Sequence, residues 1–490
     1  MQVRIAEGAE PMKPAEYQDH DGLGLADLLR RKEVTPAELM DCAIHVAEQV
    51  NPRLNALCHT DFELGRQKAR DADHRGHFGA LPMLLKDSGL AARDLPNSLG
   101  SRLFAGLNIP FDATVTERFV ADGFLHFGRT TAPEFSMAPT TEAAVNGGPT
   151  RNPWNPDHST GGSSGGAAAA VAAGILPVAH GSDGGGSIRI PASCCGIYGL
   201  KPSRGLVPAG PSRGEGWGGL ASDGVLTRTV RDTAAALDGI GGSDPGAPYA
   251  APQGPGSYLA NLDQPFDHPL RIAMWTKAFD DIPVHDECLA AVRNTAALLE
   301  QLGHYVIETA LPDIQFSKFV TAQINVMAAN VAVLVNGKVR NAPDASWRDL
   351  LEPAILDAYE MGRRLTAEEY TLAITRFHMI GRQMAAHMAG FDFVLTPTLT
   401  QPPLRLGSLS TDTDFRSFRT DASRYTTFLA IINASGQPAA CLPMHWTPEG
   451  LPVGVQLIAP FGGETDLLRL SAQLEQAQPW FDKRPAICGI

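Results

Sequence analysis

Apolar residues recur at helical spacing near the start of the chain. Thr35, Pro36 and Glu38 form the pattern of a capping box, with a hydroxyl at the cap, proline at the first helical position and an acid three residues after the cap. Apolar side chains follow at Leu39, Cys42, Ala43, Val46 and Val50. The pattern predicts an amphipathic helix that begins at Thr35.

Short continuous apolar runs predict buried strands elsewhere. In the run ALPMLLKDSGL, residues 80–90, the apolar part ends at Lys86. Residues 118–130 repeat the arrangement, with a helical piece that leads into FLHFGRT. Further strands are predicted by ILPVAH and by runs within residues 196–208, 391–397 and 451–460.

Most of the remaining pattern is helical. Helical periodicity covers residues 286–302, 318–390 and 464–477, whereas residues 243–266 are rich in Pro, Gly, Ala and Asp and predict a surface excursion. Strands that alternate with helices indicate an α/β architecture. We find no internal repeat, long linker or sharp change of composition, so residues 1–490 are expected to form one domain.

Composition narrows the possible classes of function. The 490 residues are 44% hydrophobic and 19% charged, which is typical of a soluble globular protein. A formal net charge of −13 without a basic stripe argues against a nucleic-acid partner, because phosphate binding needs clustered lysine and arginine. Seven scattered cysteines indicate a reducing compartment. Cys194 and Cys195 are adjacent and neither HExxH nor CxxC occurs, so no metal site is expected.

Neither export nor a membrane span is expected. Residues 1–13 lack an apolar stretch of signal-peptide length. The longest apolar run, residues 167–179, contains Gly174 and Pro177 and is too short to cross a bilayer. We therefore expect a cytoplasmic protein that has no membrane partner.

A glycine-rich loop with a serine lies at residues 180–193. Gly184, Gly185 and Gly186 have no Cβ, so their backbone N–H groups can converge on a point near Ser187. Such a cluster suits an oxyanion hole, with Ser187 at its edge as a nucleophile. A plain glycine-rich turn that ends in a serine is the alternative.

A second glycine-rich loop, residues 159–174, lies just before the first. Ser163 and Ser164 precede an alanine-rich helix, so either can be its N-cap. The segment GGSSG, residues 161–165, also matches the G-x-S-x-G nucleophile elbow, which would make Ser163 the nucleophile of an α/β-hydrolase. The elbow requires a preceding strand, whereas NPWNPDHST predicts a loop.

A third glycine-rich segment, GEGWGG at residues 214–219, matches the G-x-G-x-x-G pattern. No strand is predicted before it and no helix clearly follows it. Because the dinucleotide-binding motif needs both, we do not expect a nucleotide site here.

A serine nucleophile needs a base. His180 stands seven residues before Ser187, at the end of the predicted strand ILPVAH, and nothing in the pattern directs it toward the loop. Lys86 follows an apolar run, so burial can lower its pKa toward a proton-accepting form. A solvated lysine at a strand end is the alternative.

The order of these segments resembles the amidase signature family. The resemblance starts from GGSSGG, an alanine-rich helix and GSDGGGSIRIPASCCGIYGLKP, and LPMLLKD resembles the family strand with the catalytic lysine. It extends through residues 128–137, 150–156 and 436–460, which contain GRTTAPEFSM, TRNPWNP and GQPAACLPMHWTPEGLPVGVQLIAP. It covers nearly the whole chain, and residues 245–390 match least.

The resemblance implies the fold and its division. It implies an α/β fold with a central mixed β-sheet flanked by helices on both faces. Residues 1–490 would form a single amidase domain with its signature core at 81–208. Residues 245–390 would form a variable, mostly helical region around the substrate pocket.

The resemblance also implies a Ser–cisSer–Lys triad. Ser187 falls at the position of the family nucleophile, Ser163 at the bridging serine after a cis peptide bond, and Lys86 at the base. The surrounding residues would be the oxyanion donors Gly184, Gly185, Gly186 and Ser187, the supporting Ser164, and the loop-bracing Asp183 and Arg189. Gly184 departs from the family, which often has threonine there, so the loop is expected to be more mobile.

The expected reaction is amide hydrolysis through an acyl-enzyme, without cofactor or metal. The substrate is expected to be a small apolar, aryl or cyclic amide, with Ser136 and Trp154 among its contacts. The alternatives are a glutamine amidotransferase component that releases ammonia from glutamine, or an esterase or carbamate hydrolase, each with the same triad. The expected partner is a small-molecule amide, and a homodimer is one expected assembly.

Overall fold

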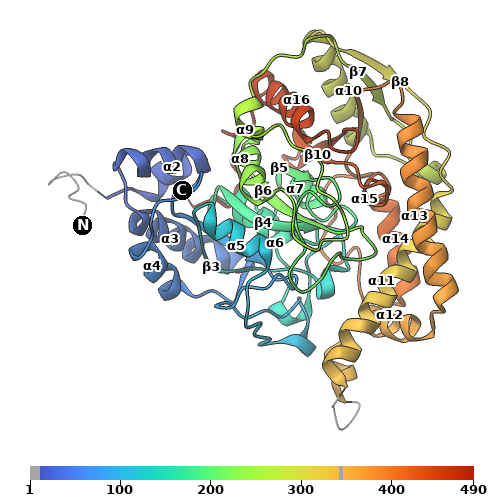
Figure 1. Cartoon of the computed structure of the whole chain (residues 1–490), viewed down its shortest axis with the longest axis horizontal. Coiled ribbons are helices and arrows are strands. Elements are labelled where there is room, and N and C mark those ends of the chain that lie inside the picture. Colours follow the sequence, from blue (N-terminus) through green and yellow to red (C-terminus); the bar gives the residue numbers. More distant parts are fainter. Residues whose placement is uncertain (1–10, 341–345, 490) are drawn as a thin grey trace.

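A large mixed sheet forms the centre of the molecule (Figure 1). The structure is a computed structural model that describes residues 11–340 and 346–489. The strands of this sheet are β4 (Val178–Asp183), β5 (Tyr198–Lys201), β6 (Ser222–Thr227), β7 (Arg271–Met274), β8 (Tyr305–Glu308), β9 (Phe393–Pro397), β10 (Ala439–Trp446) and β11 (Pro452–Ile458). Their order is β4-β6-β5-β10-β11-β9-β7-β8. β7 runs parallel to β8 and β9, and the other neighbours are antiparallel.

A separate three-stranded sheet carries Lys86. It consists of β1 (Leu57–Cys58), β3 (Phe124–Thr130) and β2 (Leu81–Lys86), in that order. β2 and β3 are parallel, and Lys86 lies opposite Thr130 at the end of the pairing. All six residues of β2 are buried, as its apolar run predicts. The expected central sheet is therefore confirmed, but the strand of Lys86 belongs to a second sheet beside it.

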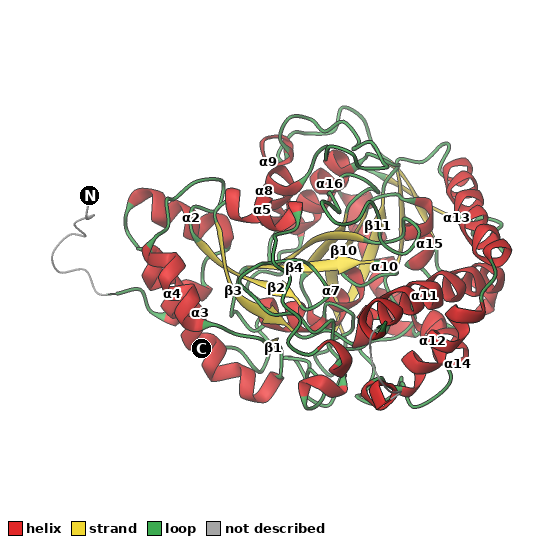
Figure 2. Cartoon of the chain, turned by 60° about the horizontal axis from the view of Figure 1, so that its bottom comes forward, coloured by secondary structure: helices red, strands yellow, loops and turns green. Residues whose placement is uncertain are grey.

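Helices surround both sheets. Figure 2 shows the strands in the middle of the molecule with helices on either side. The helices of the first half are α1 (Pro14–Gln18), α2 (Gly22–Arg31), α3 (Pro36–Leu54), α4 (Phe62–Arg70), α5 (Thr114–Ala121), α6 (Gly165–Ala172), α7 (Arg189–Cys195) and α8 (Val230–Ile240). Those of the second half are α9 (Tyr258–Asn261), α10 (Asp286–Gln301), α11 (Phe316–Val339), α12 (Pro353–Arg364), α13 (Ala367–His387), α14 (Phe415–Tyr425), α15 (Ala430–Ser435) and α16 (Glu464–Ala477).

Two large apolar clusters fill the interior. One joins the N-terminal helices and the small sheet to most strands of the large sheet. The other is built mainly from α11 to α15 and lies beside the sheet, on the right in Figure 1. α11 is long and apolar enough to cross a membrane by length and composition alone, but 61% of its most apolar stretch is buried in the structure. The burial agrees with its position in the second cluster.

The elements predicted from periodicity are largely confirmed. α3 begins at the predicted capping box, where Thr35 Oγ1 accepts from the Glu38 N–H at 3.2 Å and Glu38 Oε2 accepts from the Thr35 N–H at 2.8 Å. The five apolar positions predicted for its inner face are all buried. Residues 1–10, on which the expectation of no export signal mainly rests, lie outside the described part of the chain.

Three strands that the sequence did not predict, β6, β7 and β8, have weak local signals. β7 and β8 contain four residues each, and β8 is largely exposed. β6 begins with Ser-Asp-Gly, which is a turn-like composition. The strand predicted at ILPVAH is present as β4, which starts at Val178 and continues to Asp183, three residues beyond the predicted run. Pairing with neighbours distant in sequence stabilises these strands, and this pairing leaves no periodicity in the local sequence.

Candidate active site

Lys86 ends β2 with its ammonium group inside the protein. The side chain is fully buried, and its Nζ donates to Ser163 Oγ at 2.7 Å and to Ser182 Oγ at 2.9 Å. Burial lowers the pKa of Lys86 to about 7, although the charges of Asp223 and Asp183 oppose this shift. Close to neutral pH, a substantial fraction of this lysine is therefore neutral and able to accept a proton.

Ser163 is presented by the loop before α6. The peptide bond between Gly162 and Ser163 is cis, and Ser163 is fully buried. A Cβ at Gly162 would lie 2.3 Å from Thr140 O, so only glycine fits before this serine. No named strand precedes Ser163 within residues 131–162, which the structure describes in full, so the context that a nucleophile elbow requires is absent.

Ser164 connects the two glycine-rich loops. Its backbone N–H donates to Ser187 O at 3.2 Å, and its hydroxyl donates to Ser182 O at 3.2 Å. It is also the N-cap residue of α6, although its side chain does not cap the helix. Ser164 therefore holds the loop of Ser163 against the end of β4 and the loop of Ser187.

Ser187 lies in the loop between β4 and α7. A Cβ at Gly184 would lie 2.7 Å from Cε3 of the Trp217 ring. Gly186 has a φ of +118°, and a Cβ there would lie 2.6 Å from Leu429 Cδ1. The close contacts of the loop therefore require glycine at both positions.

The backbone donors of this loop are divided between two uses. The Gly186 N–H donates to Asp183 Oδ1 at 2.7 Å, so it is not free for an oxyanion. The N–H groups of Gly184, Gly185 and Ser187 have no acceptor within residues 11–340 and 346–489. This corrects the prediction of four oxyanion donors, because Gly186 instead fixes the turn to the carboxylate.

Asp183 and Arg189 brace the loop from both ends. Arg189 Nε donates to Asp183 Oδ2 at 2.9 Å and Nη2 to Asp183 Oδ1 at 2.8 Å, and neither side chain is exposed. Burial raises the pKa of Asp183, but the charge and hydrogen bonds of Arg189 outweigh it and hold the pKa well below its usual range. Arg189 also donates to Gln456 Oε1 at 2.7 Å and to Asn433 Oδ1 at 2.6 Å, which ties the loop to β11 and α15.

The serines share one cavity of about 260 Å³. Ser163, Ser182, Gly184 and Ser187 line it together with Ser136, so the structure brings this predicted substrate contact to the site. The remaining lining residues include Leu99, Phe135, Arg213, Trp217, Asp223 and Leu334. Most of the wall is apolar or hydroxyl-bearing, which suits a small uncharged ligand.

Trp154 does not lie at this cavity. Its indole Nε1 donates to Cys195 O at 2.8 Å, and its ring centroid lies 5.7 Å from that of Trp446. The structure therefore does not place Trp154 where a substrate contact was predicted. Its indole is instead hydrogen-bonded to the last residue of α7.

His180 contacts the backbone of Lys86, not Ser187. The fully buried ring accepts the Lys86 N–H on Nδ1 at 3.1 Å, so Nε2 carries the proton and donates to Asp223 Oδ1 at 3.2 Å. Burial lowers the pKa of His180, although Asp223 opposes the shift. A neutral His180 thus fixes the strand end from which Lys86 reaches the serines.

Sequence reasoning missed Ser182, Trp217 and Asp223. Ser182 is brought to Lys86 by contact of β4 with β2, and Trp217 lies in the segment GEGWGG that matched a nucleotide motif. A serine in a strand, a tryptophan in a loop and an aspartate after a turn carry no distinguishing local signal. The positions depend on contacts between segments far apart in the chain.

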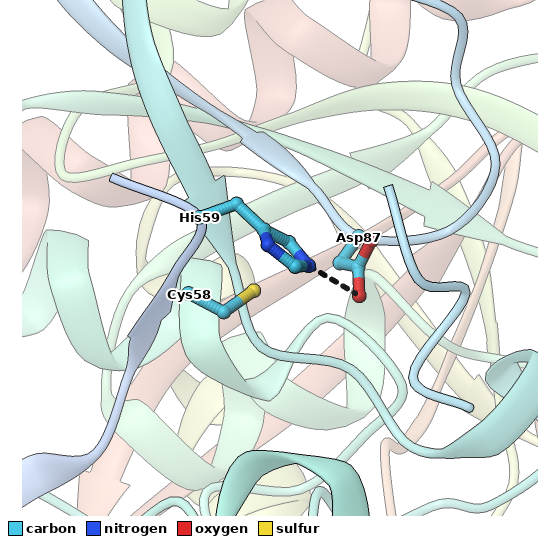
Figure 3. A group of neighbouring side chains, drawn as sticks. All are labelled: Cys58, His59 and Asp87. Carbon is cyan, nitrogen blue, oxygen red and sulfur yellow. Dashed lines mark ion pairs between the residues drawn. The ribbon is translucent and has the colours of Figure 1, made fainter. Parts of the chain in front are cut away.

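Cys58, His59 and Asp87 form the one group in the described residues with ligand atoms close enough for a metal (Figure 3). His59 Nε2 lies 3.9 Å from Asp87 Oδ2. The Asp87 carboxylate already accepts from the Ser98 N–H at 2.7 Å, from the Ser98 hydroxyl and from the Gly100 N–H at 3.1 Å. These donors occupy its oxygens and hold it in place beside Lys86, so the group is better explained as a structural support.

Known proteins place the chain in one family. The family model described as Amidase matches residues 38–468. The 6-aminohexanoate-cyclic-dimer hydrolase of Paenarthrobacter ureafaciens is 35% identical to this chain, and the alignment covers 95% of this chain and 96% of that relative. A solved structure of 6-aminohexanoate cyclic dimer hydrolase with its substrate has a TM-score of 0.90 at 33% identity, over 96% of this chain and 99% of that chain. A bacterial aryl acylamidase of the amidase signature family has a TM-score of 0.85 at 27% identity, over 94% and 96%. The chain therefore belongs to the amidase family, among the amidase signature enzymes that hydrolyse carbon–nitrogen bonds other than peptide bonds.

Proposed function

We propose that this amidase cleaves its substrate through an acyl-enzyme on Ser187, with Ser163 and Lys86 as the proton relay. The observation that carries the proposal is the 2.7 Å contact between the fully buried Lys86 Nζ and Ser163 Oγ, in a cavity that Ser187 also lines. A lysine with a pKa of about 7 can accept a proton from Ser163 near neutral pH.

In the first step, Ser187 Oγ attacks the acyl carbon and forms a carbon–oxygen bond. Its proton passes to Ser163, whose own proton passes to Lys86. The carbon–nitrogen bond then breaks, and the relay returns a proton to the leaving nitrogen. Water attacks the acyl-enzyme along the same relay and releases the acid and free Ser187.

The oxyanion that forms during attack needs preorganised donors. The N–H groups of Gly184, Gly185 and Ser187, which have no acceptor in the described residues, are the proposed donors. The Gly186 N–H contributes indirectly, because its bond to Asp183 keeps the turn closed.

The substrate proposed is a small apolar, aryl or cyclic amide. The mostly apolar and hydroxyl-bearing wall of the cavity supports an uncharged ligand. The names of the relatives, a cyclic-dimer hydrolase and an aryl acylamidase, support cyclic and aryl amides in particular. The products are a carboxylic acid and an amine or ammonia.

Labelling with a fluorophosphonate followed by peptide mapping tests the nucleophile. The label is expected on Ser187 and is expected to disappear in Ser187→Ala, with a known serine hydrolase as the positive control. A label on Ser163 would overturn the assignment in favour of the elbow mechanism. An unlabelled protein beside a labelled control would contradict an accessible serine nucleophile.

A further inference from the structure

α11 brings a buried amide to the loop of the nucleophile. Gln323 is only 2% exposed, and its Nε2 has no hydrogen-bond acceptor in the described part of the chain. A Cβ built on Gly185 would lie 3.0 Å from this nitrogen. The side chain therefore lies directly against the residue that stands two positions before Ser187.

The amide packs against the loop whose neighbouring residues, Gly184 and Ser187, line the substrate cavity. Gly185 is partly exposed, unlike Gly184 and Gly186 on either side of it. Leu334 on the same helix lines the cavity, so α11 forms part of its wall. Gly185 has no side chain, and this absence leaves room for Gln323 Nε2 beside the loop.

A buried donor without an acceptor needs an explanation, because nearly all such groups in folded proteins are paired. The carbonyl oxygens of the loop do not pair with Gln323 Nε2. Ser136 Oγ, in the wall of the same cavity, is also buried and unpaired within the described residues. The site therefore offers more hydrogen-bonding capacity than the protein itself satisfies.

The scissile oxygen does not account for the Gln323 donor. The oxyanion formed on attack has three lone pairs, and the three N–H groups of Gly184, Gly185 and Ser187 are already available for it. A fourth donor therefore needs a different acceptor, elsewhere on the acyl part of the substrate.

We infer that the Gln323 amide selects substrates whose acyl group carries a second hydrogen-bond acceptor, such as another amide carbonyl, near the scissile bond. The inference rests on the proposed function and names the substrate class of the same site. Gln323 acts as a specificity-determining residue, because a site built to donate to an oxygen discriminates strongly against a substrate that lacks it.

Two 4-nitroanilides of equal chain length test the inference. One carries an N-acetylglycyl group, with a second carbonyl, and the other a 4-methylpentanoyl group, in which a methyl replaces that oxygen and a methylene replaces the amide N–H. The wild-type enzyme is expected to have the higher kcat/KM for the first. Gln323→Met, which keeps the length of the side chain and removes both N–H donors, is expected to lower that value about tenfold to a hundredfold and to leave the second within about twofold.

The controls separate specificity from stability and from the proposed mechanism. The melting temperature of Gln323→Met is expected to match or exceed that of the wild type, because the variant removes an unpaired buried donor. Thr321→Ala, an exposed change on the same helix, is expected to leave both substrates unaffected. Gln323→Glu, which keeps the shape but converts the amide to an acceptor, is expected to lose the preference as well.

Three results would overturn the inference. An equal loss of kcat/KM on both anilides would assign Gln323 to the scissile oxygen or to the fold. An unchanged preference in Gln323→Met would exclude the contact, and an enzyme that labels at Ser187 but cleaves neither anilide would exclude this substrate class. Failure of the proposed function is seen separately, as activity that survives Ser187→Ala.

Discussion

A lysine side chain is normally charged in water, and the site of Lys86 opposes that charge by enclosing the ammonium completely. Burial lowers its pKa to about 7, and the hydroxyls of Ser163 and Ser182 are its nearest acceptors. Lys201 is a second buried lysine whose pKa burial lowers to about 7, but its Nζ donates to Pro202 O, away from the cavity. Position relative to the serines therefore distinguishes the proposed base, Lys86, from Lys201.

The first prediction concerns the pH dependence of the reaction. Lys86 accepts a proton only when it is neutral, so kcat/KM is expected to rise about tenfold per pH unit below pH 7 and to level off above it. Lys86→Ala is expected to lower kcat/KM by about 10²–10⁴-fold and to remove this rise. Initial rates on one amide substrate across the pH range measure both effects.

Lys201→Met is the matched control, because it removes a buried lysine with a similarly lowered pKa. It is expected to keep the wild-type pH profile, whatever its effect on stability. A flat wild-type profile between about pH 6 and 8, or near-normal turnover by Lys86→Ala, would contradict the relay.

The two glycine-rich loops hold the serines in place through different devices. The loop of Ser163 depends on Gly162 packed against Thr140, whereas the loop of Ser187 depends on glycines packed against Trp217 and Leu429. The sequence identified both loops and their serines, since glycine runs and the order of segments are local signals. It did not identify the neighbours that make glycine necessary, because these come from segments far away in the chain.

Gly184, at a position where the family often has threonine, gives the second prediction. A Cβ at this position would lie 2.7 Å from Trp217 Cε3, so Gly184→Ala must displace a ring that lines the cavity. We expect a fall in kcat/KM, since overpacking forces neighbours away from their preferred positions at a cost of about 1–3 kcal/mol. The kinetic constants of Gly184→Ala, Trp217→Leu and the double variant form a cycle that measures the coupling.

In the Trp217→Leu background, Gly184→Ala is expected to have little further effect, because the ring that it would displace is gone. Equal losses in both backgrounds would instead assign the effect of alanine to the backbone of the loop. In that case, glycine at position 184, where the family often has threonine, would be explained by the mobility of the loop and not by contact with Trp217.

At the scale of the whole molecule, the site joins parts of the chain that local patterns treat separately. Lys86 comes from the small sheet, Ser163 and Ser187 from two glycine-rich loops, and the inferred specificity residue Gln323 from the helical region. The resemblance of ordered motifs predicted the first three residues. It could not predict Gln323, because residues 245–390 match the family pattern least.

The Asp183–Arg189 pair shows how these parts are held together. The pair fixes the Ser187 loop, and Arg189 continues to Asn433 and Gln456 near the other end of the chain. Both charged groups are fully buried, so each depends on the other to offset the loss of solvation. The loop, α15 and β11 are therefore expected to lose stability together.

The last prediction tests this dependence. Asp183→Asn leaves the Arg189 guanidinium buried without its charged partner, and is expected to lower the free energy of unfolding by about 3–5 kcal/mol. It also weakens the acceptor that holds the Gly186 N–H, so the rate of Ser187 labelling is expected to fall even well below the unfolding temperature. Denaturant unfolding and labelling rates measure the two effects. Glu63→Gln, which removes the exposed partner of Arg66 on α4, is the control and should change neither quantity. If Asp183→Asn unfolded like the wild type while labelling slowed, the pair would serve the geometry of the loop alone, because its contacts with Asn433 and Gln456 would then add nothing to the stability of the whole.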